Sequence, residues 1–190
     1  MKYIVYKTLR TTLKPLFMLL YRPKYIGLNN IPVDGSVILA GNHTHPIDAA
    51  LMIGGPKRVV HMMSKKELFK GKISSRFFRS MGCIRVDRSI HDENAKSEAI
   101  DVLNNGNVLG IFPEGTVNKT KEKLLPFKYG AVSFAKKTNS YIVPFAITGK
   151  YKIFNGHIRI IYGSPYKVKG DLEKENELLM KKVLELMDVK

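Results

Sequence analysis

The chain alternates short apolar runs with longer segments of helical spacing, and this alternation constrains the fold most. Apolar runs bounded by Gly, Pro and polar residues predict strands at 36–40, 58–63, 83–86, 107–112, 141–147 and 158–162. Helical spacing predicts helices at 46–53, 67–81, 92–104, 129–137 and 172–187, with Gly106 and Asp171 as end signals of the third and the last. Such alternation predicts an α/β fold with helices on both faces of a central sheet. With 190 residues, 44% of them apolar, the chain is long enough for one such domain.

The first 24 residues follow a different pattern. Apolar residues at spacings of three and four predict one helical face, and bases lie beside it: Tyr6, Leu9, Leu13, Leu16 and Leu20 on the face, Lys7, Arg10 and Lys14 on its flank. Pro15 predicts a kink, or a split into two short helices. A basic amphipathic helix suits a membrane interface, but it also suits an arm packed on its own domain, and one segment can do both. We expect an arm over residues 1–24 and a folded domain over 25–190.

A formal net charge of +16 predicts an anionic partner. The 32 Lys and Arg residues outnumber the 16 Asp and Glu residues, and the excess lies in 1–33, 56–90 and 117–137. A nucleic acid, an anionic membrane and a phosphorylated substrate all fit such charge. The chain has no RNP-type aromatic motif, zinc-finger spacing or basic zipper, which argues against nucleic acid.

The sequence also bears on location. No run reaches the ~18–20 apolar residues of a membrane span. The apolar run at 16–21 is followed by Arg22, Pro23 and Lys24 rather than by a signal-peptide cleavage site, so we expect an unexported protein. Cys83 is the single Cys and can form no intrachain disulfide, which suits a reducing compartment. Its place on a predicted strand favours a small buried residue over a nucleophile.

The densest polar segment, residues 41–50, follows the first predicted strand and contains His43, His45 and Asp48. Pro46 favours the first helical turn, which puts Asp48 near a helix start and His43 in the preceding turn. On a continuous helix, five positions would separate the two side chains by about 140°. Across a bend the carboxylate can instead reach an imidazole nitrogen, which orients the ring and leaves its other nitrogen free as a base.

Two other interpretations of this segment stay open. His-x-His followed by Asp can bind a metal, but the usual His-x-His-x-Asp-His run has Asp and a further His where this chain has Ile47 and Ala49. The segment can also be a plain capping turn with surface histidines.

Residues 111–116 form a second polar segment, again at the end of an apolar strand. In open α/β sheets, ligands bind beyond the carboxyl ends of the strands. Glu114 can hydrogen-bond a polyol there, neighbouring amides can face an oxyanion, and Gly115 allows close backbone approach. Taken alone, the segment is equally compatible with an ordinary turn.

Residues 82–88 form a third segment, in which Arg85 and Arg88 can hold a phosphate. The planar guanidinium suits this task because it donates two parallel hydrogen bonds. The alternative is a surface salt bridge with Asp87.

Together these segments resemble the lysophospholipid acyltransferase family, most closely the bacterial 1-acyl-sn-glycerol-3-phosphate acyltransferases. The family's His-x4-Asp, Gly-x-x-x-Val-Asp-Arg, Phe-Pro-Glu-Gly-Thr, Pro-Phe-Lys-x-Gly and late Val-Pro motifs match, in order, His43–Asp48, Gly82–Arg88, Phe112–Thr116, Pro126–Gly130 and Val143–Pro144. The matches run from about residue 25 to 165. The resemblance implies an acyltransferase domain over 25–190 with a mostly parallel central sheet flanked by helices, as in glycerolipid acyltransferases.

The resemblance implies acyl transfer from a thioester, acyl-CoA or acyl-carrier protein, to the sn-2 hydroxyl of lysophosphatidic acid, giving phosphatidic acid. His43 would be the general base, oriented by Asp48, and no acyl-enzyme is implied. The substrate-binding residues would be Arg85, Arg88, Glu114, Gly115, Thr116 and Lys128. Base and oxyanion donors suffice for this reaction, so neither a metal nor a cofactor is expected. The enzyme would lie on the cytoplasmic face of an anionic cell membrane, as a peripheral or monotopic protein.

Two departures from the family pattern leave the acceptor open. Val117 follows the Phe-Pro-Glu-Gly-Thr motif where the family commonly has Arg, and Arg85 stands where the family is often apolar. Both departures would be explained if the Arg that binds the phosphate lies in the 82–88 segment here, instead of directly after the Phe-Pro-Glu-Gly-Thr motif. A sister transferase that acts on glycerol 3-phosphate or on another lysolipid is the alternative.

Overall fold

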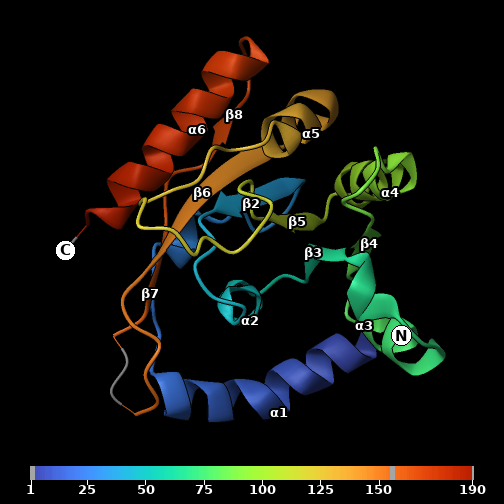
Figure 1. The fold of residues 1–190 in the computed structure, drawn as a ribbon, viewed down its shortest axis with the longest axis vertical. Helices are drawn as coiled ribbons and strands as arrows, with labels where there is room; N and C mark the ends of the chain where they lie inside the picture. The colour runs from blue at the N-terminus through green and yellow to red at the C-terminus, as the bar shows by residue number, and fades with distance from the viewer. Residues whose placement is uncertain (1–2, 155–156, 190) are drawn as a thin grey trace.

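The computed structural model describes residues 3–154 and 157–189, and its described strands form one sheet (Figure 1). The strand order is β1-β7-β6-β2-β5-β3-β4, with β8 paired to β6. The strands are β1 (Lys24–Ile26), β2 (Val37–Gly41), β3 (Val60–Lys65), β4 (Ile84–Val86), β5 (Val108–Ile111), β6 (Tyr141–Thr148), β7 (Arg159–Tyr162) and β8 (Tyr166–Lys167). Residues 1 and 2 of the expected arm lie outside the described residues.

Most of the sheet is parallel. Strands β6, β2, β5, β3 and β4 run side by side in parallel register, and β1 is parallel to β7. The antiparallel pairs are β6 with β7 and β6 with β8. The predicted α/β fold with a mostly parallel central sheet is confirmed.

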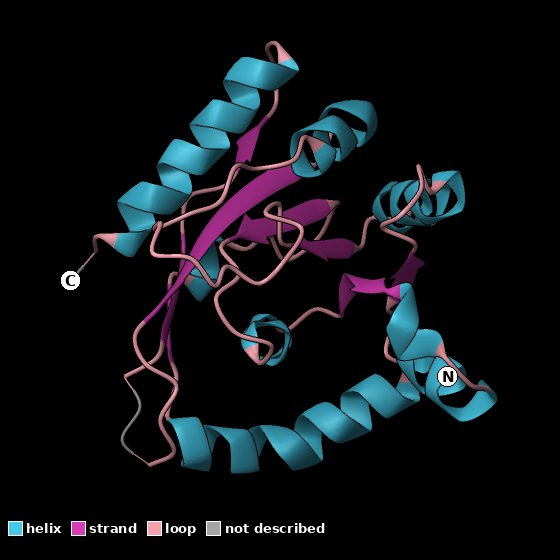
Figure 2. Cartoon of the chain, in the orientation of Figure 1, coloured by secondary structure: helices cyan, strands magenta, loops and turns pink. Residues whose placement is uncertain are grey.

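Helices cover both faces of the sheet (Figures 1 and 2). On one face lie α4 (Glu93–Asn104), α5 (Gly130–Thr138) and α6 (Leu172–Met187), and on the other lie α1 (Ile4–Tyr21), α2 (Asp48–Gly54) and α3 (Lys72–Ser80). Successive residues of a strand point to opposite faces, so Ile38 packs in the first layer and Leu39 in the second. Both residues are fully buried, as expected for a central strand covered on both sides.

The predicted end signals have the expected geometry, but one predicted helix is divided. Gly106 has a φ of +68° just after α4, and the Asp171 carboxylate accepts a hydrogen bond from the Glu173 N–H at the start of α6. The helix expected over 67–81 is instead the 3₁₀ turn Lys66–Phe69 followed by α3. Gly71 separates them with a φ of +115°, a conformation that interrupts a helix. The short edge strands β1 and β8 were not predicted, since two or three residues carry no visible periodicity.

Helix α1 is continuous, so the predicted split at Pro15 is wrong. Proline removes the hydrogen bond to the Thr11 carbonyl, but Thr11 is exposed and water can satisfy that group. The helix is docked: Tyr6 is buried and its hydroxyl accepts from the Val60 N–H, while Arg10 donates to the Lys57 carbonyl at 3.1 Å. Among the described residues, no helix combines the length and apolarity that crossing a membrane requires.

Candidate active site

The three polar segments lie at the carboxyl ends of parallel strands. Strand β2 leads into His43, β4 into Arg88 and β5 into Glu114. Because β2 and β5 are neighbours, their loops touch: the His43 N–H donates to Glu114 Oε1 at 2.7 Å. The placement follows the rule that open α/β sheets build sites at this edge.

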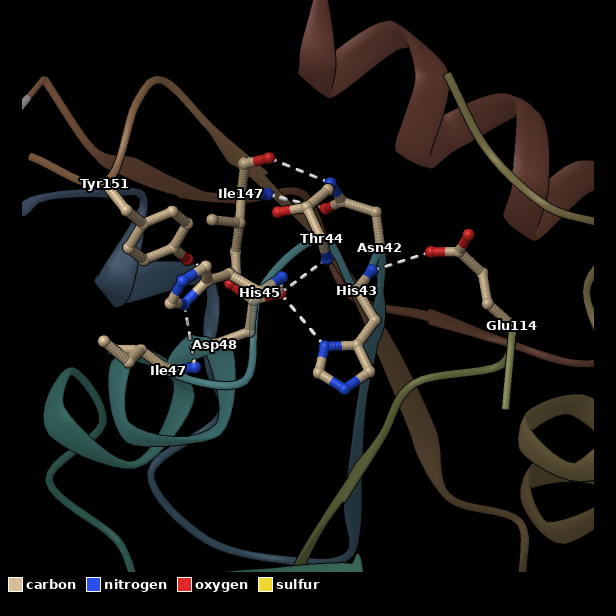
Figure 3. Close-up of polar contacts among 9 residues, drawn as sticks. All are labelled: Asn42, His43, Thr44, His45, Ile47, Asp48, Glu114, Ile147 and Tyr151. Carbon is tan, nitrogen blue, oxygen red and sulfur yellow. Dashed lines mark hydrogen bonds and ion pairs between the residues drawn. The ribbon is translucent and has the colours of Figure 1, made fainter. Parts of the chain in front are cut away.

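His43 and Asp48 meet across the bend between β2 and α2 (Figure 3). The distance from His43 Nδ1 to Asp48 Oδ2 is 3.0 Å, and Asp48 is the first residue of α2. The Asp48 side chain is fully buried, whereas that of His43 is 15% exposed. The same Oδ2 accepts hydrogen bonds from the N–H groups of Thr44 at 2.6 Å and His45 at 2.8 Å. The expected contact between imidazole and carboxylate is therefore present.

The His43 ring is held from its face as well as from its edge. It stacks on the Phe112 ring with centroids 4.0 Å apart and planes 10° apart. Its second nitrogen, Nε2, points away from Asp48 (Figure 3). A contact from Nδ1 to a carboxylate favours a proton on Nδ1, which leaves Nε2 as the basic nitrogen.

His45 has a different environment from His43. Its Nδ1 accepts from the Ile47 N–H at 3.2 Å, and its ring stacks on Tyr151 with centroids 4.2 Å apart. No group of three or more His, Cys, Asp or Glu side chains within residues 3–154 and 157–189 is placed to hold a metal ion.

Glu114 is buried and connects the loop after β5 with the loop after β2. Its Oε1 accepts from the His43 N–H and its Oε2 accepts from the Leu125 N–H at 2.8 Å. Burial raises the pKa of Glu114, although these two hydrogen bonds and the nearby His43 act in the opposite direction. Both carboxylate oxygens of Glu114 thus contact the backbone, one on each side of the site, and the contact with a polyol stays a prediction.

A cavity of about 370 Å³ opens beside His43. Its apolar walls come mainly from the core layer of α4, α5 and α6, with Phe112 from the other layer: Met63, Val86, Ala95, Ile111, Phe112, Ala131 and Phe134. Three cationic side chains line it as well, Arg88, Lys96 and Lys128. The arrangement offers an apolar chain a place beside the imidazole and an anionic group a place at the cations.

The structure sorts the sequence-predicted substrate residues into two groups. Arg88, Gly115 and Lys128 line the His43 cavity, and the Lys128 side chain passes close to Gly115. Thr116 is exposed and is not part of the cavity lining.

Arg85 does not reach the His43 cavity. It lies in a separate pocket with Lys66, Phe69, Lys70, Ser75 and Arg79. The reason is the two-residue period of β4, which sends Val86 into the His43 cavity and Arg85 to the opposite face.

Asp87 braces the turn that presents Arg88. Its carboxylate accepts from Lys66 Nζ at 2.6 Å, from the Ser89 N–H at 3.0 Å and from the Ser89 hydroxyl at 2.6 Å. These contacts, led by Lys66, lower the pKa of Asp87 from 3.8 to about 2. The cation that pairs with Asp87 is therefore Lys66, and not Arg85 or Arg88 as the alternative interpretation of this segment expected.

Sequence reasoning missed Tyr151 and Lys96. Tyr151 donates its hydroxyl hydrogen to Asp48 Oδ1, and Lys96 lines the cavity from α4. Neither lies within a recognised motif, and Tyr151 is 103 positions from Asp48. No local pattern could have identified them.

Comparison with known proteins adds an independent observation. Residues 22–148 match the sequence profile of the family described as Acyltransferase. The chain is 31% identical over 166 residues to a 1-acyl-sn-glycerol-3-phosphate acyltransferase of Bacillus subtilis, covering 85% of this chain and 82% of that protein. A protein of the same name from Borreliella burgdorferi is 32% identical over 130 residues, covering 67% of this chain and 52% of that protein. A crystal structure of the 1-acyl-sn-glycerophosphate acyltransferase PlsC from Thermotoga maritima is similar with a TM-score of 0.75 and 26% identity, over 98% of this chain and 81% of that one.

Proposed function

Because this chain belongs to the acyltransferase family, we propose that it is a 1-acyl-sn-glycerol-3-phosphate acyltransferase of phospholipid biosynthesis. It moves a fatty acyl group from a thioester to the sn-2 hydroxyl of lysophosphatidic acid, and phosphatidic acid is the product. The observation that carries the proposal is the His43–Asp48 contact, placed beside a cavity with apolar walls. Three cations line the polar part of this cavity, Arg88, Lys96 and Lys128, together with Asp87 and Asp92. Residues 25–190 form the acyltransferase domain of this proposal and residues 1–24 its arm.

His43 acts as the general base in this reaction. Nε2 takes the proton of the sn-2 hydroxyl while the hydroxyl oxygen attacks the thioester carbonyl carbon. Collapse of the tetrahedral intermediate breaks the C–S bond, and the imidazolium returns the proton to the departing thiolate. Asp48 keeps the ring in the required orientation and stabilises the imidazolium, a role supported by its burial and its short contact with Nδ1.

The acceptor phosphate binds to the cationic part of the cavity. Arg88 supplies a planar fork that suits a phosphate, and Lys96 and Lys128 supply two further charges. Arg85 has no part in this contact, because it faces the opposite pocket. Glu114 acts through the backbone of His43 rather than through the substrate.

Acyl-CoA and acyl-carrier protein are both compatible with this site as donors. Val117 is the remaining reason to consider another acceptor, because the family commonly has Arg at this position. A donor-by-acceptor assay on the purified protein separates these cases. Activity with glycerol 3-phosphate or another lysolipid, but not with lysophosphatidic acid, would replace the proposed acceptor.

The enzyme works on the cytoplasmic face of the cell membrane as a peripheral or monotopic protein. Leu13, Leu16 and Leu19 of α1 are each more than half exposed, and Ile73 of α3 is 88% exposed. Exposed bases such as Lys70 and Lys72 flank Ile73. Apolar side chains beside Lys and Arg fit an anionic lipid surface. Each Lys or Arg near that surface contributes ~1 kcal/mol to the free energy of membrane binding.

Replacing His43 with Ala tests the chemistry. We expect a loss of about 10²–10⁴-fold in kcat, the range for removal of a general base, with an unchanged circular dichroism spectrum. His157→Ala is the matched control, since His157 is exposed and outside the cavity. Near-normal turnover of His43→Ala would refute the base, and an inactive wild-type protein with every donor would refute the function.

A further inference from the structure

We infer that Tyr151 is a positioning residue for the His43–Asp48 pair, and that it makes the orientation of this pair depend on helix α1. The inference rests on the proposed function and adds to it a residue outside the five motifs. Tyr151 comes from the connection between β6 and β7, whereas His43 and Asp48 come from the connection between β2 and α2. Three separate segments of the chain therefore meet at one carboxylate.

The Tyr151 hydroxyl donates a hydrogen bond to Asp48 Oδ1. The other oxygen, Oδ2, already accepts from two backbone N–H groups and contacts His43. Because Asp48 is fully buried, an Oδ1 without a donor would carry the full cost of desolvation. The tyrosine hydroxyl thus completes the set of donors that holds the carboxylate in one rotamer.

The surroundings of this hydroxyl favour its protonated form. Burial raises the pKa of Tyr151 far above its ordinary value, and the negative charge of Asp48 raises it further. Tyr25 acts in the same direction. The hydroxyl therefore remains protonated at neutral pH and is a hydrogen-bond donor to Asp48 there.

The Tyr151 ring contacts His45 and the C-terminal end of α1. One face of the ring stacks on His45, with planes 18° apart (Figure 3). Its edge meets the ring of Tyr21, in the last turn of α1, with centroids 6.5 Å apart. Three residues further on, the Phe154 N–H donates to the Leu20 carbonyl at 2.7 Å. The segment that carries Tyr151 is thus attached to the C-terminal end of α1 by a ring contact and a backbone hydrogen bond.

Through these contacts α1 also positions Tyr151, in addition to its proposed contact with lipid. Its exposed leucines face away from the domain, while Phe17 and Tyr21 belong to the core layer that includes Tyr151. The end of α1 is therefore positioned to set the place of Tyr151 and, through Asp48, the orientation of His43. An arm that only anchored the protein would need no contact with this loop.

Tyr151→Phe tests the hydroxyl. We expect kcat to fall about tenfold to a hundredfold, the range for loss of a hydrogen bond to a charged group, with KM for both substrates unchanged within about twofold. KM should not move because Tyr151 is absent from the lining of the substrate cavity. A purely structural role would instead lower the thermal midpoint and leave kcat per folded enzyme as it was.

Tyr166→Phe is the matched control. Its hydroxyl is also buried, but it has no hydrogen-bond partner among the described residues and lies in the core layer of α4, α5 and α6. We expect kcat and KM of this variant to equal those of the wild type. Equal loss of kcat in both tyrosine variants would overturn the inference, as would an unchanged kcat in Tyr151→Phe.

Tyr21→Ala tests the link to α1 in the same assay. We expect a lower kcat with unchanged binding to vesicles, because Tyr21 faces the domain. Leu16→Ala, on the outward side of the same helix, should weaken binding to vesicles and leave kcat at saturating vesicle concentration unchanged. A Tyr21→Ala enzyme with wild-type kcat would refute the link. Failure of the proposed function is distinguished from all these results by an inactive wild-type protein.

Discussion

Two buried carboxylates in this protein show how hydrogen bonds offset the cost of burying a charge. Asp48 and Glu114 are both buried carboxylates, and each oxygen of both residues accepts a hydrogen bond. Most of the donors are backbone N–H groups, which the fold holds in place without any side-chain entropy cost. The two carboxylates therefore tie together the loops after β2, β5 and β6, and His43 stands between them.

Asp87 offers a test of pH dependence at the level of one residue. Its pKa is lowered from 3.8 to about 2, chiefly by Lys66 and then by Ser89. A lowered carboxyl pKa stabilises the folded state above the unfolded pKa, and this contribution is lost as pH falls through the folded value. We expect Asp87→Asn to be less stable than the wild type at neutral pH, with the difference vanishing as the pH falls from 3.8 toward about 2. Urea denaturation over this pH range measures the free energy of unfolding of both proteins. A stability difference between them that is constant with pH would contradict the lowered pKa of Asp87.

Pairs of strands are joined at the site by a side chain as well as by the backbone. The parallel pairing of β2 with β6 ends at Gly41 and Phe145, where a Cβ on Gly41 would lie 2.2 Å from the Phe145 carbonyl oxygen. Asn42 then continues the pairing with its amide: Nδ2 donates to the Ile147 carbonyl at 2.9 Å, and Oδ1 accepts from the Ile147 N–H at 2.7 Å. The backbone of residue 42 is thereby free to turn toward His43.

Asn42→Ala is expected to weaken this junction of strands. Both polar groups of buried Ile147 would lose their partners, at a cost of about 2–4 kcal/mol in the free energy of unfolding. Chemical denaturation measures the change. The control Asn29→Ala, at an exposed position, should stay within about 0.5 kcal/mol of the wild type. Equal stability of both variants would show that the Asn42 amide does not support the sheet.

At the scale of the whole molecule, one helical layer exposes more large apolar side chains than the other. Leu13, Leu16, Leu19, Ile73 and Phe77 are exposed on α1 and α3, against Leu178 on α6. Helices α1 and α3 lie on the same side of the sheet, and the N-terminal end of α1 lies beside α3 (Figure 1). Both carry exposed apolar residues in a protein of net charge +16. This side of the molecule is the one that we propose rests on lipid.

Replacing Leu13, Leu16 and Leu19 together with Ser tests this orientation. The three side chains are 53%, 52% and 57% exposed, so the folded state should lose little stability. We expect roughly a hundredfold weaker binding to vesicles that contain anionic lipid, at about 1 kcal/mol for each half-exposed Leu. Cosedimentation with vesicles measures it, and added salt should weaken binding further because it screens the bases. Leu178→Ser, on α6 in the opposite layer, is the control; equal effects of both changes would refute the orientation.

Short-range patterns predicted much of this protein. Strand and helix periods, the end signals at Gly106 and Asp171, and the spacing of His43 and Asp48 are each encoded within a few residues. The structure contains them, except that the helix expected over 67–81 is divided at Gly71. Periods repeat within one element, so a single window of sequence contains the information. The position of the site at the carboxyl edge followed from the same patterns, since parallel strands bring their ends together.

The remaining features depend on which segments the topology brings side by side. Three such features are the opposite directions of Arg85 and Arg88, the contact of Glu114 with the His43 backbone, and the contact of Tyr151 with Asp48. Each depends on contacts between segments that lie far apart in the sequence. Register and strand order decide such contacts, because a side chain reaches only what the sheet places within a few ångströms of it. The motifs and their meeting at one edge of the sheet could therefore be predicted from the chain, whereas the residues that surround and support them required the folded arrangement.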